Sequence, residues 1–242
     1  MSQNRSNAST WTSRGPRRVP PQVPDLAALK AANPDAFVTV ADHVVAPTLA
    51  AAGLRTVVQN DGQRRPGGFV LPMFPQSGLE PRDAGRGDAV ERVVFVGCRG
   101  QLRADFASPA FAAAARRLGV EFDVVDKGRA AEWGCAQRTA DLTLAVRPAH
   151  VELARKPPTK LVNAWCAGCP ALLGPEPAYR SLREDDLDYV EVDSPRAALD
   201  AIARLRNDPA LYARMRRRCA ERAADYSNRR TAERWAAVLF TH

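Results

Sequence analysis

Several short segments of the sequence place glycines, prolines and charged side chains directly after apolar runs that are typical of buried strands. In open parallel sheets, ligands bind beyond the carboxyl ends of the strands. Arginine can hold a phosphate group through paired hydrogen bonds, whereas lysine acts on it as a point charge. The segments therefore predict a crevice suited to a diphosphate, and they are residues 97–100, 126–129, 147–148 and 174–177.

Taken one at a time, these segments are weak signals. Residues 97–100 fit neither the dinucleotide-binding pattern nor the Walker pattern. Glu176 stands between two prolines after an apolar run, so it is either a solvated turn residue or a carboxylate that a rigid turn holds in place. A helix expected from Lys160 would add the positive end of its dipole to the crevice.

The elements that must position these residues alternate regularly along the chain. Apolar runs predict strands at residues 36–40, 56–58 and 69–71, and again at 93–96, 122–125, 142–146, 170–173 and 189–192. Helical spacing predicts helices at residues 25–30, 44–52, 109–118, 160–167, 195–206, 209–224 and 229–240. This alternation is typical of an α/β fold, and it predicts two doubly wound, Rossmann-like lobes.

Three regions divide the chain by composition. Residues 1–24 are rich in Ser, Asn, Pro and Arg and are expected to form a disordered basic tail. Residues 25–90 predict a short N-terminal α/β lobe and a linker, because the stretch 72–88 is rich in Pro, Gly and charge. Residues 91–242 predict a larger C-terminal lobe with closing helices.

The run of residues 156–179 resembles the donor-site segment of GT-B glycosyltransferases. In that superfamily a helix with Lys or Glu near its start ends in an Ala-x-Gly-x-Pro pattern, and a strand and an acidic turn follow it. This chain has Lys160 near the start of the expected helix, Gly168 at its end and Glu176 in the turn. The resemblance covers about residues 93–239.

The resemblance implies that the helix and the turn hold a nucleotide-sugar donor. Lys156 or Lys160 would contact the diphosphate, and Arg147 or Arg99 would assist. Such enzymes need no metal or further cofactor, because basic side chains and a helix dipole stabilise the departing nucleoside diphosphate. The residues implied to bind the donor are Gly97, Arg99, Arg147, Lys156, Lys160, Glu176 and Tyr179.

Glu176 and His43 are the candidate catalytic residues. The resemblance implies that Glu176 hydrogen-bonds sugar or ribose hydroxyls, and that Tyr179 either joins it or packs beneath the turn. His43 follows the first expected strand, where it would face the crevice between the lobes and contact the sugar or act as a base. The alternative is a helix N-terminus that Asp42 caps, with His43 incidental. Residues 60–62 could reach an acceptor, although Asn-Asp-Gly is primarily a turn signal.

Two features depart from the pattern of the superfamily. Many retaining members place two glutamates eight positions apart around this helix, and the corresponding residues here are Arg155 and Asn163. Residues 25–71 resemble only the last part of an acceptor lobe, which implies that the first lobe is truncated or minimal. Two functions are therefore open: transfer of a sugar from a nucleotide-sugar to a glycan, lipid-linked or small-molecule acceptor, or non-catalytic binding of a nucleotide-sugar or a partner.

The formal charge of +8 at pH 7 does not by itself indicate nucleic-acid binding. Four arginines precede the first acidic residue, Asp25, which leaves +4 for the rest of the chain. A second basic cluster at residues 214–218 shares an expected helix with Glu221 and Asp225, which favours a solvated helix face over a site for nucleic acid or anionic lipid. Peripheral contact with an anionic membrane and self-association stay open.

The cysteines and the apolar runs favour a cytoplasmic address. Five cysteines, an odd number, predict no disulfide framework. No apolar run approaches the ~18 residues that a membrane span needs, and residues 1–24 lack the apolar core of a secretory signal. Cys166 and Cys169 close an expected helix, whereas redox pairs open one, and neither a second pair nor spaced histidines indicate zinc. Packing is the expected role of these two cysteines.

Overall fold

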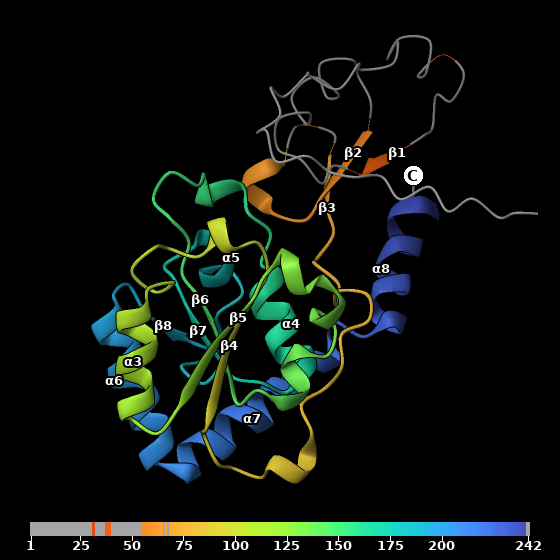
Figure 1. Ribbon diagram of the computed structural model, residues 1–242. Helices are drawn as coiled ribbons and strands as arrows, with labels where there is room; N and C mark the ends of the chain where they lie inside the picture. The colour runs from red at the N-terminus through yellow and green to blue at the C-terminus, as the bar shows by residue number, and fades with distance from the viewer. Residues whose placement is uncertain (1–30, 32–36, 40–54, 65, 67, 241–242) are drawn as a thin grey trace, which may run out of the picture.

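The computed structural model describes residues 31, 37–39, 55–64, 66 and 68–240 (Figure 1). The basic tail, the helices predicted at 25–30 and 44–52, and the candidate base His43 lie outside the described residues. In the part of the chain that the structure describes, no helix is long and apolar enough to cross a membrane.

The larger sheet has five parallel strands in the order β5-β4-β6-β7-β8. They are β4 (Arg92–Val96), β5 (Glu121–Val125), β6 (Leu142–Ala145), β7 (Ala171–Leu173) and β8 (Val190–Glu191). Strands β6 and β7 are buried throughout and β4 nearly so, which explains why they read as continuous apolar runs. The chain passes from β4 to β5 on one side and then to β6 on the other, so the topological switch point lies between β4 and β6.

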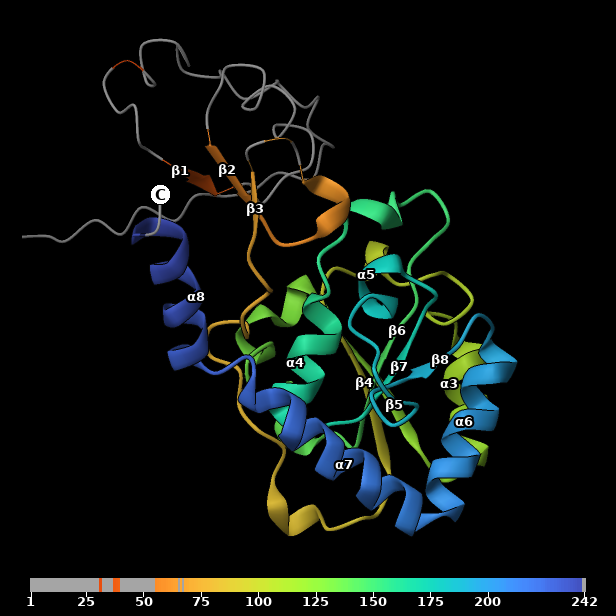
Figure 2. The same cartoon turned by 180° about the vertical axis from the view of Figure 1, so that it is seen from behind.

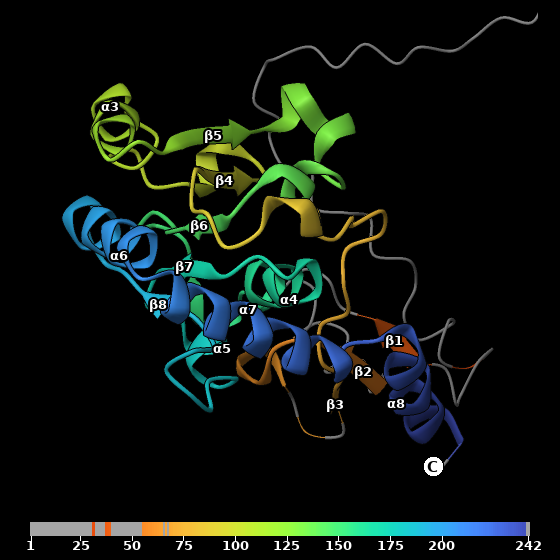
Figure 3. The same ribbon diagram turned by 90° about the horizontal axis from the view of Figure 1, so that it is seen from below.

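Helices cover both faces of this sheet (Figure 3). Helix α3 (Pro109–Arg117) packs with α6 (Pro195–Asn207) on one face, while α4 (Thr159–Ala167) lies on the other face with α7 (Pro209–Ala224) against it. Helix α5 (Pro177–Arg180) is a single turn after β7. Helices α3, α6 and α7 each begin with a proline in the first turn and a side-chain cap, which is supplied by Ser108, Ser194 and Asp208.

A smaller parallel sheet consists of β1 (Phe37–Thr39), β2 (Arg55–Val58) and β3 (Phe69–Val70). The last helix, α8 (Asn228–Phe240), leaves the larger lobe and lies beside this sheet (Figures 1 and 2). Val238 of α8 packs with Val57 and Leu71, so this helix ties the two lobes together. The prediction of an α/β fold with two parallel sheets is confirmed, and the predicted strands agree with the described ones to within one residue at each end.

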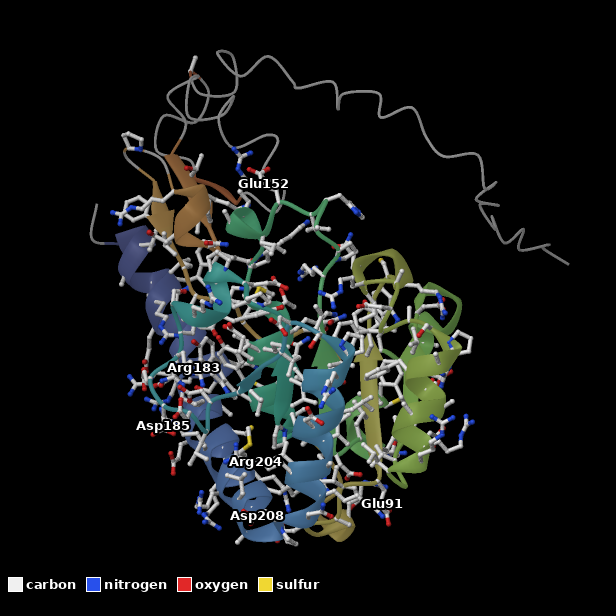
Figure 4. The ribbon with its side chains drawn as sticks, turned by 90° about the vertical axis from the view of Figure 1, so that its left-hand side faces the viewer. Glu91, Glu152, Arg183, Asp185, Arg204 and Asp208 are labelled. Carbon is white, nitrogen blue, oxygen red and sulfur yellow. The ribbon has the colours of Figure 1, made fainter. Side chains whose placement is uncertain are left out.

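The two lobes meet where β2 ends. The side-chain amide of Asn60 donates hydrogen bonds to the carbonyls of Ala154 and Lys156, at 3.1 and 2.5 Å. Figure 4 shows Glu152, two residues before Ala154, at the end of the larger lobe that faces the smaller sheet. Gly62 approaches so closely that a Cβ atom there would lie 2.1 Å from the Ala154 carbonyl oxygen. The Asn-Asp-Gly turn is therefore a contact between the two lobes.

Gly62→Ala is expected to lower the free energy of unfolding by about 1–3 kcal/mol, because the added methyl group has no room beside the Ala154 carbonyl. Urea unfolding followed by circular dichroism measures the loss. Gly100→Ala is the matched control, since nothing lies within 4 Å of the Cβ position there. Equal stability of the two variants would contradict the close approach.

The stretch 72–88, interpreted from its composition as a linker, packs against the larger lobe. The Gln76 backbone N–H donates to Asn163 Oδ1 at 3.0 Å, and Asn163 Nδ2 donates back to Gln76 Oε1 at 3.2 Å. Arg82, with 1% of its side chain exposed, forms an ion pair with the buried Asp141 at 2.7 Å. This stretch thus supplies structural contacts that its composition does not reveal.

Candidate functional site

The loop after β4 leaves the switch point through Gly97. Gly97 has φ +142°, a backbone conformation that favours glycine, and its N–H donates to the Val125 carbonyl at 3.0 Å. A Cβ atom at this position would lie 2.8 Å from Lys160 Nζ. The glycine therefore gives the lysine room to reach the carboxyl end of β4.

Lys160 enters the switch point from the first turn of α4. Its ammonium group donates to the Val96 carbonyl and lies 5.3 Å from the centre of the Phe95 ring, where the ring attracts a cation. Burial and, to a lesser extent, the positive charge of Arg147 lower the pKa of Lys160 to about 8. The lysine is thus a cation that a nearby anion would stabilise strongly.

Arg147 and Glu176 form a buried ion pair across the ends of β6 and β7. Arg147 Nε donates to both carboxylate oxygens of Glu176 at 3.0 Å, and its Nη1 donates to Gln101 Oε1 at 3.0 Å. The Arg147 side chain is 10% exposed and that of Glu176 is 1% exposed. Burial raises the pKa of the Glu176 carboxyl, and the charge of Arg147 opposes this rise only in part.

Tyr179 packs beneath the turn, fully buried and edge-on to the Tyr189 ring. Burial raises the pKa of Tyr179, the negative charge of Glu176 raises this pKa further, and the positive charge of Arg147 lowers it. The buried hydroxyl therefore lies next to the Arg147–Glu176 pair.

The remaining predicted residues differ in position. Lys156 is half-buried and its charge lowers the pKa of Glu176, so the two side chains lie near each other. Arg99 is exposed, and its guanidinium donates to the Ala107 carbonyl at 2.9 Å instead of joining the pair. The structure brings together Gly97, Arg147, Lys160 and Glu176, with Lys156 and Tyr179 beside them.

Sequence reasoning missed one residue of this site. Gln101 holds Arg147 in place, and it lies one residue beyond the segment 97–100 that the strand-end rule selects. Extending the strand-end segment by one residue finds Gln101.

Cys166 and Cys169 lie at the end of α4. Burial raises the pKa of the Cys166 thiol to about 11 and that of the Cys169 thiol to about 12. Thiols of this kind are protonated and unreactive at neutral pH. Among the described residues, no group of three His, Cys, Asp or Glu side chains could hold a metal ion. Cys169 is buried in the interior of the lobe, and the half-buried Cys166 packs against its core.

Comparison with known proteins gives structural neighbours. No family model matches the chain, and no curated protein matches its sequence. The crystal structure of TarM superposes with a TM-score of 0.55 over 76% of this chain and 43% of its own, at 14% identity. Sucrose-phosphate synthase (tll1590) from Thermosynechococcus elongatus superposes with a TM-score of 0.54 over 84% of this chain and 66% of its own, at 12% identity. AviGT4, a glycosyltransferase involved in avilamycin A biosynthesis, superposes with a TM-score of 0.45 over 77% of this chain and 64% of its own, at 16% identity.

TarM and sucrose-phosphate synthase are glycosyltransferases of the GT-B type. At such low identity the two likenesses show the fold, and the fold of this chain is of the GT-B type. The expectation drawn from residues 156–179 is thus confirmed for the fold. The chain spans less than two thirds of the length of each of these three structures.

Proposed function

We propose that the chain binds a nucleotide-sugar at the switch point of its larger sheet and transfers the sugar to an acceptor. The observation that carries this proposal is the convergence of Lys160, Arg147 and Glu176 at the carboxyl ends of β4, β6 and β7. Two cations and a carboxylate are the groups that a sugar diphosphate requires there. The GT-B fold supports the proposal, because the structural neighbours are glycosyltransferases.

Lys160 and Arg147 would hold the diphosphate. Arg147 now uses its Nε on Glu176, and a phosphate oxygen that takes the place of Glu176 would gain this donor. Helix α4 has Pro158 in the cap position, which supplies no side-chain hydrogen bond to the first amides of the helix. Those amides and the helix dipole would face the same negative charge.

In the proposed reaction an acceptor hydroxyl attacks the anomeric carbon, the bond from that carbon to the diphosphate oxygen breaks, and the hydroxyl proton passes to a base. Lys160, Arg147 and the α4 dipole stabilise the charge that develops on the leaving nucleoside diphosphate. Glu176 accepts hydrogen bonds from sugar or ribose hydroxyls, and His43 is the candidate base. The proposed donor site is completed by Gly97, Lys156 and Tyr179, whereas Arg99 would have to leave the Ala107 carbonyl to reach it.

Thermal unfolding with UDP, GDP, ADP and CMP, and then with matching sugar donors, tests this proposal. One base is expected to raise Tm selectively and in proportion to the logarithm of ligand concentration. Lys160→Ala is expected to weaken binding about 10- to 100-fold, because it removes a charge-assisted contact. Glu176→Ala is expected to remove the additional affinity that the sugar confers.

Arg217→Ala is the matched control, because Arg217 is exposed on α7. We expect it to bind like the unaltered chain. The site assignment is wrong if Lys160→Ala and Glu176→Ala also bind nucleotide and donor like the unaltered chain.

A non-catalytic binding module is the second candidate function. Asn163 occupies the position of one glutamate of the retaining enzymes, and its buried amide is engaged with Gln76. Release of nucleoside diphosphate from the donor that the thermal screen selects separates the two functions. Tight binding without release, with or without acceptors, would support the module, whereas measurable release excludes it.

A further inference from the structure

A cavity of about 210 Å³ lies between the two lobes, beside the proposed donor site. Its walls come from the ends of β2 and β3 on one side, and from the start of α4 and the segment after β7 on the other. Pro158 lies two residues before Lys160, and Ala178 lies two residues after Glu176. The cavity therefore adjoins the place where the proposed function puts the sugar of the donor.

The walls of this interlobe cavity are mainly apolar, and six of the lining residues are Val70, Pro72, Met73, Pro158, Ala178 and Leu182. Two of the four polar lining side chains are engaged elsewhere. Asn60 Nδ2 donates to two backbone carbonyls of the larger lobe, and Ser181 Oγ donates to the Ala178 carbonyl at 3.0 Å. Asp61, whose side chain is 83% exposed and pairs with Arg64, stands at the rim, and the half-buried Gln59 adds one amide to the wall. The cavity thus offers mainly apolar contact, with an amide in its wall and a carboxylate at its rim.

The size of the cavity limits its occupant. A closed apolar cavity of ~150 Å³ takes one benzene molecule, so the interlobe cavity has room for a six-membered ring or a short alkyl chain. Water gains little from walls that offer few hydrogen-bonding groups, whereas an apolar group gains free energy with each Å² that it removes from water. A free glycan of unsubstituted hexoses has no apolar substituent that would use these walls.

We infer that the interlobe cavity binds an apolar group of the acceptor, either a ring of phenyl size or a short alkyl chain. The inference rests on the proposed function for the position of the donor, and it narrows the acceptor to small amphipathic molecules. The apolar group fills the cavity between Met73 and Leu182. The hydroxyl that receives the sugar stays at the rim, toward the segment that carries Glu176.

Methionine methyl resonances provide a direct test on the full chain, which has three methionines. Met73 lines the cavity, whereas Met215 is 1% exposed in the core of the larger lobe. The probes are phenyl β-glucoside and methyl β-glucoside, added to ¹³C-methyl-methionine protein that is saturated with the nucleotide from the thermal screen. The phenyl probe is expected to shift the Met73 resonance saturably and to bind about tenfold more tightly than the methyl probe, with Met215 unmoved.

Met73→Gln is the matched variant, because it keeps the length of the side chain and makes that wall polar. Ligand-detected saturation transfer is expected to show that this variant loses the preference for the phenyl probe, while an unchanged Met215 resonance reports an intact fold. A Met73 resonance that stays fixed, or that responds equally to both probes, overturns the inference. Isothermal titration with nucleotide alone tests the proposed function separately, so nucleotide binding without a phenyl preference refutes only the acceptor class.

Discussion

Asp141→Ala is expected to lower the free energy of unfolding by about 3–5 kcal/mol, more than any other single change considered for this chain. Asp141 is fully buried and accepts hydrogen bonds from Arg82 at 2.7 and 3.2 Å and from Arg86 at 2.8 and 2.9 Å. Its Oδ2 also accepts the backbone N–H groups of Glu91 and Arg92. Without the carboxylate, the Arg82 guanidinium is left buried with no counter-charge.

Urea unfolding measures this loss, and Asp105→Ala is the matched control. Asp105 also accepts two hydrogen bonds from one arginine, Arg103, at 2.8 Å, but its side chain is 44% exposed. Removal of such a surface pair is expected to cost less than about 1 kcal/mol. Losses of equal size in the two variants would show that burial of Asp141 does not set its contribution.

The hydrogen bonds to Asp141 also make the free energy of unfolding depend on pH. Burial acts to raise the pKa of Asp141, but the hydrogen bonds from Arg86, Glu91 and Arg82 outweigh it and lower this pKa below its ordinary value. A carboxyl whose pKa is lower in the folded state stabilises the protein above the unfolded-state pKa and loses this contribution as the pH falls through the folded-state pKa. Below about pH 4, the unaltered chain is therefore expected to lose stability more steeply than Asp141→Ala.

The Asp141 cluster also shows where prediction from the sequence ends. Strand and helix positions follow from local signals: apolar runs for β4 and β6, Ser194 and Pro195 at the start of α6, and Gly168 in a left-handed conformation at the end of α4. Asp141 and Arg82 are 59 residues apart, and Arg82 lies in a stretch whose Pro, Gly and charged residues indicate a solvated linker. Its burial depends on tertiary packing, for which a single sequence holds no local signal.

For the candidate site, the strand-end rule selects Gly97, Arg147 and Glu176 from the sequence. The contact between Arg147 and Glu176 additionally requires β6 and β7 to be neighbours, which strand positions alone do not establish. Arg99 follows the same rule, but a turn of 3₁₀ helix directs its guanidinium to the Ala107 carbonyl. Strand-end position therefore identifies candidates, and the order of the strands decides which of them meet.

Nucleoside diphosphate affinity is expected to fall as the pH rises through about 8, because burial lowers the pKa of Lys160 to that value and only the charged lysine attracts the diphosphate. If the bound state keeps the lysine protonated, the apparent Kd at pH 9 is about tenfold higher than at pH 7. Binding then also takes up a proton near pH 8.5. Titration calorimetry in two buffers of different ionisation enthalpy measures the affinity and the proton uptake together.

Comparison of the unaltered chain with Lys160→Arg separates the effect of the charge at this position on affinity from the effect of side-chain shape. Lys160→Arg keeps a cation that stays protonated throughout this range, so its affinity is expected to be independent of pH between 7 and 9, even if the larger guanidinium binds less tightly overall. Lys160→Met is expected to bind weakly at every pH. The folding stability of the unliganded chain has the opposite pH dependence to the ligand affinity. Between pH 8 and about 10.5, the unfolded state holds the Lys160 proton that the folded state has lost, so the free energy of unfolding rises with pH. An affinity that stays constant from pH 7 to 9 in the unaltered chain would mean that Lys160 does not contact the diphosphate.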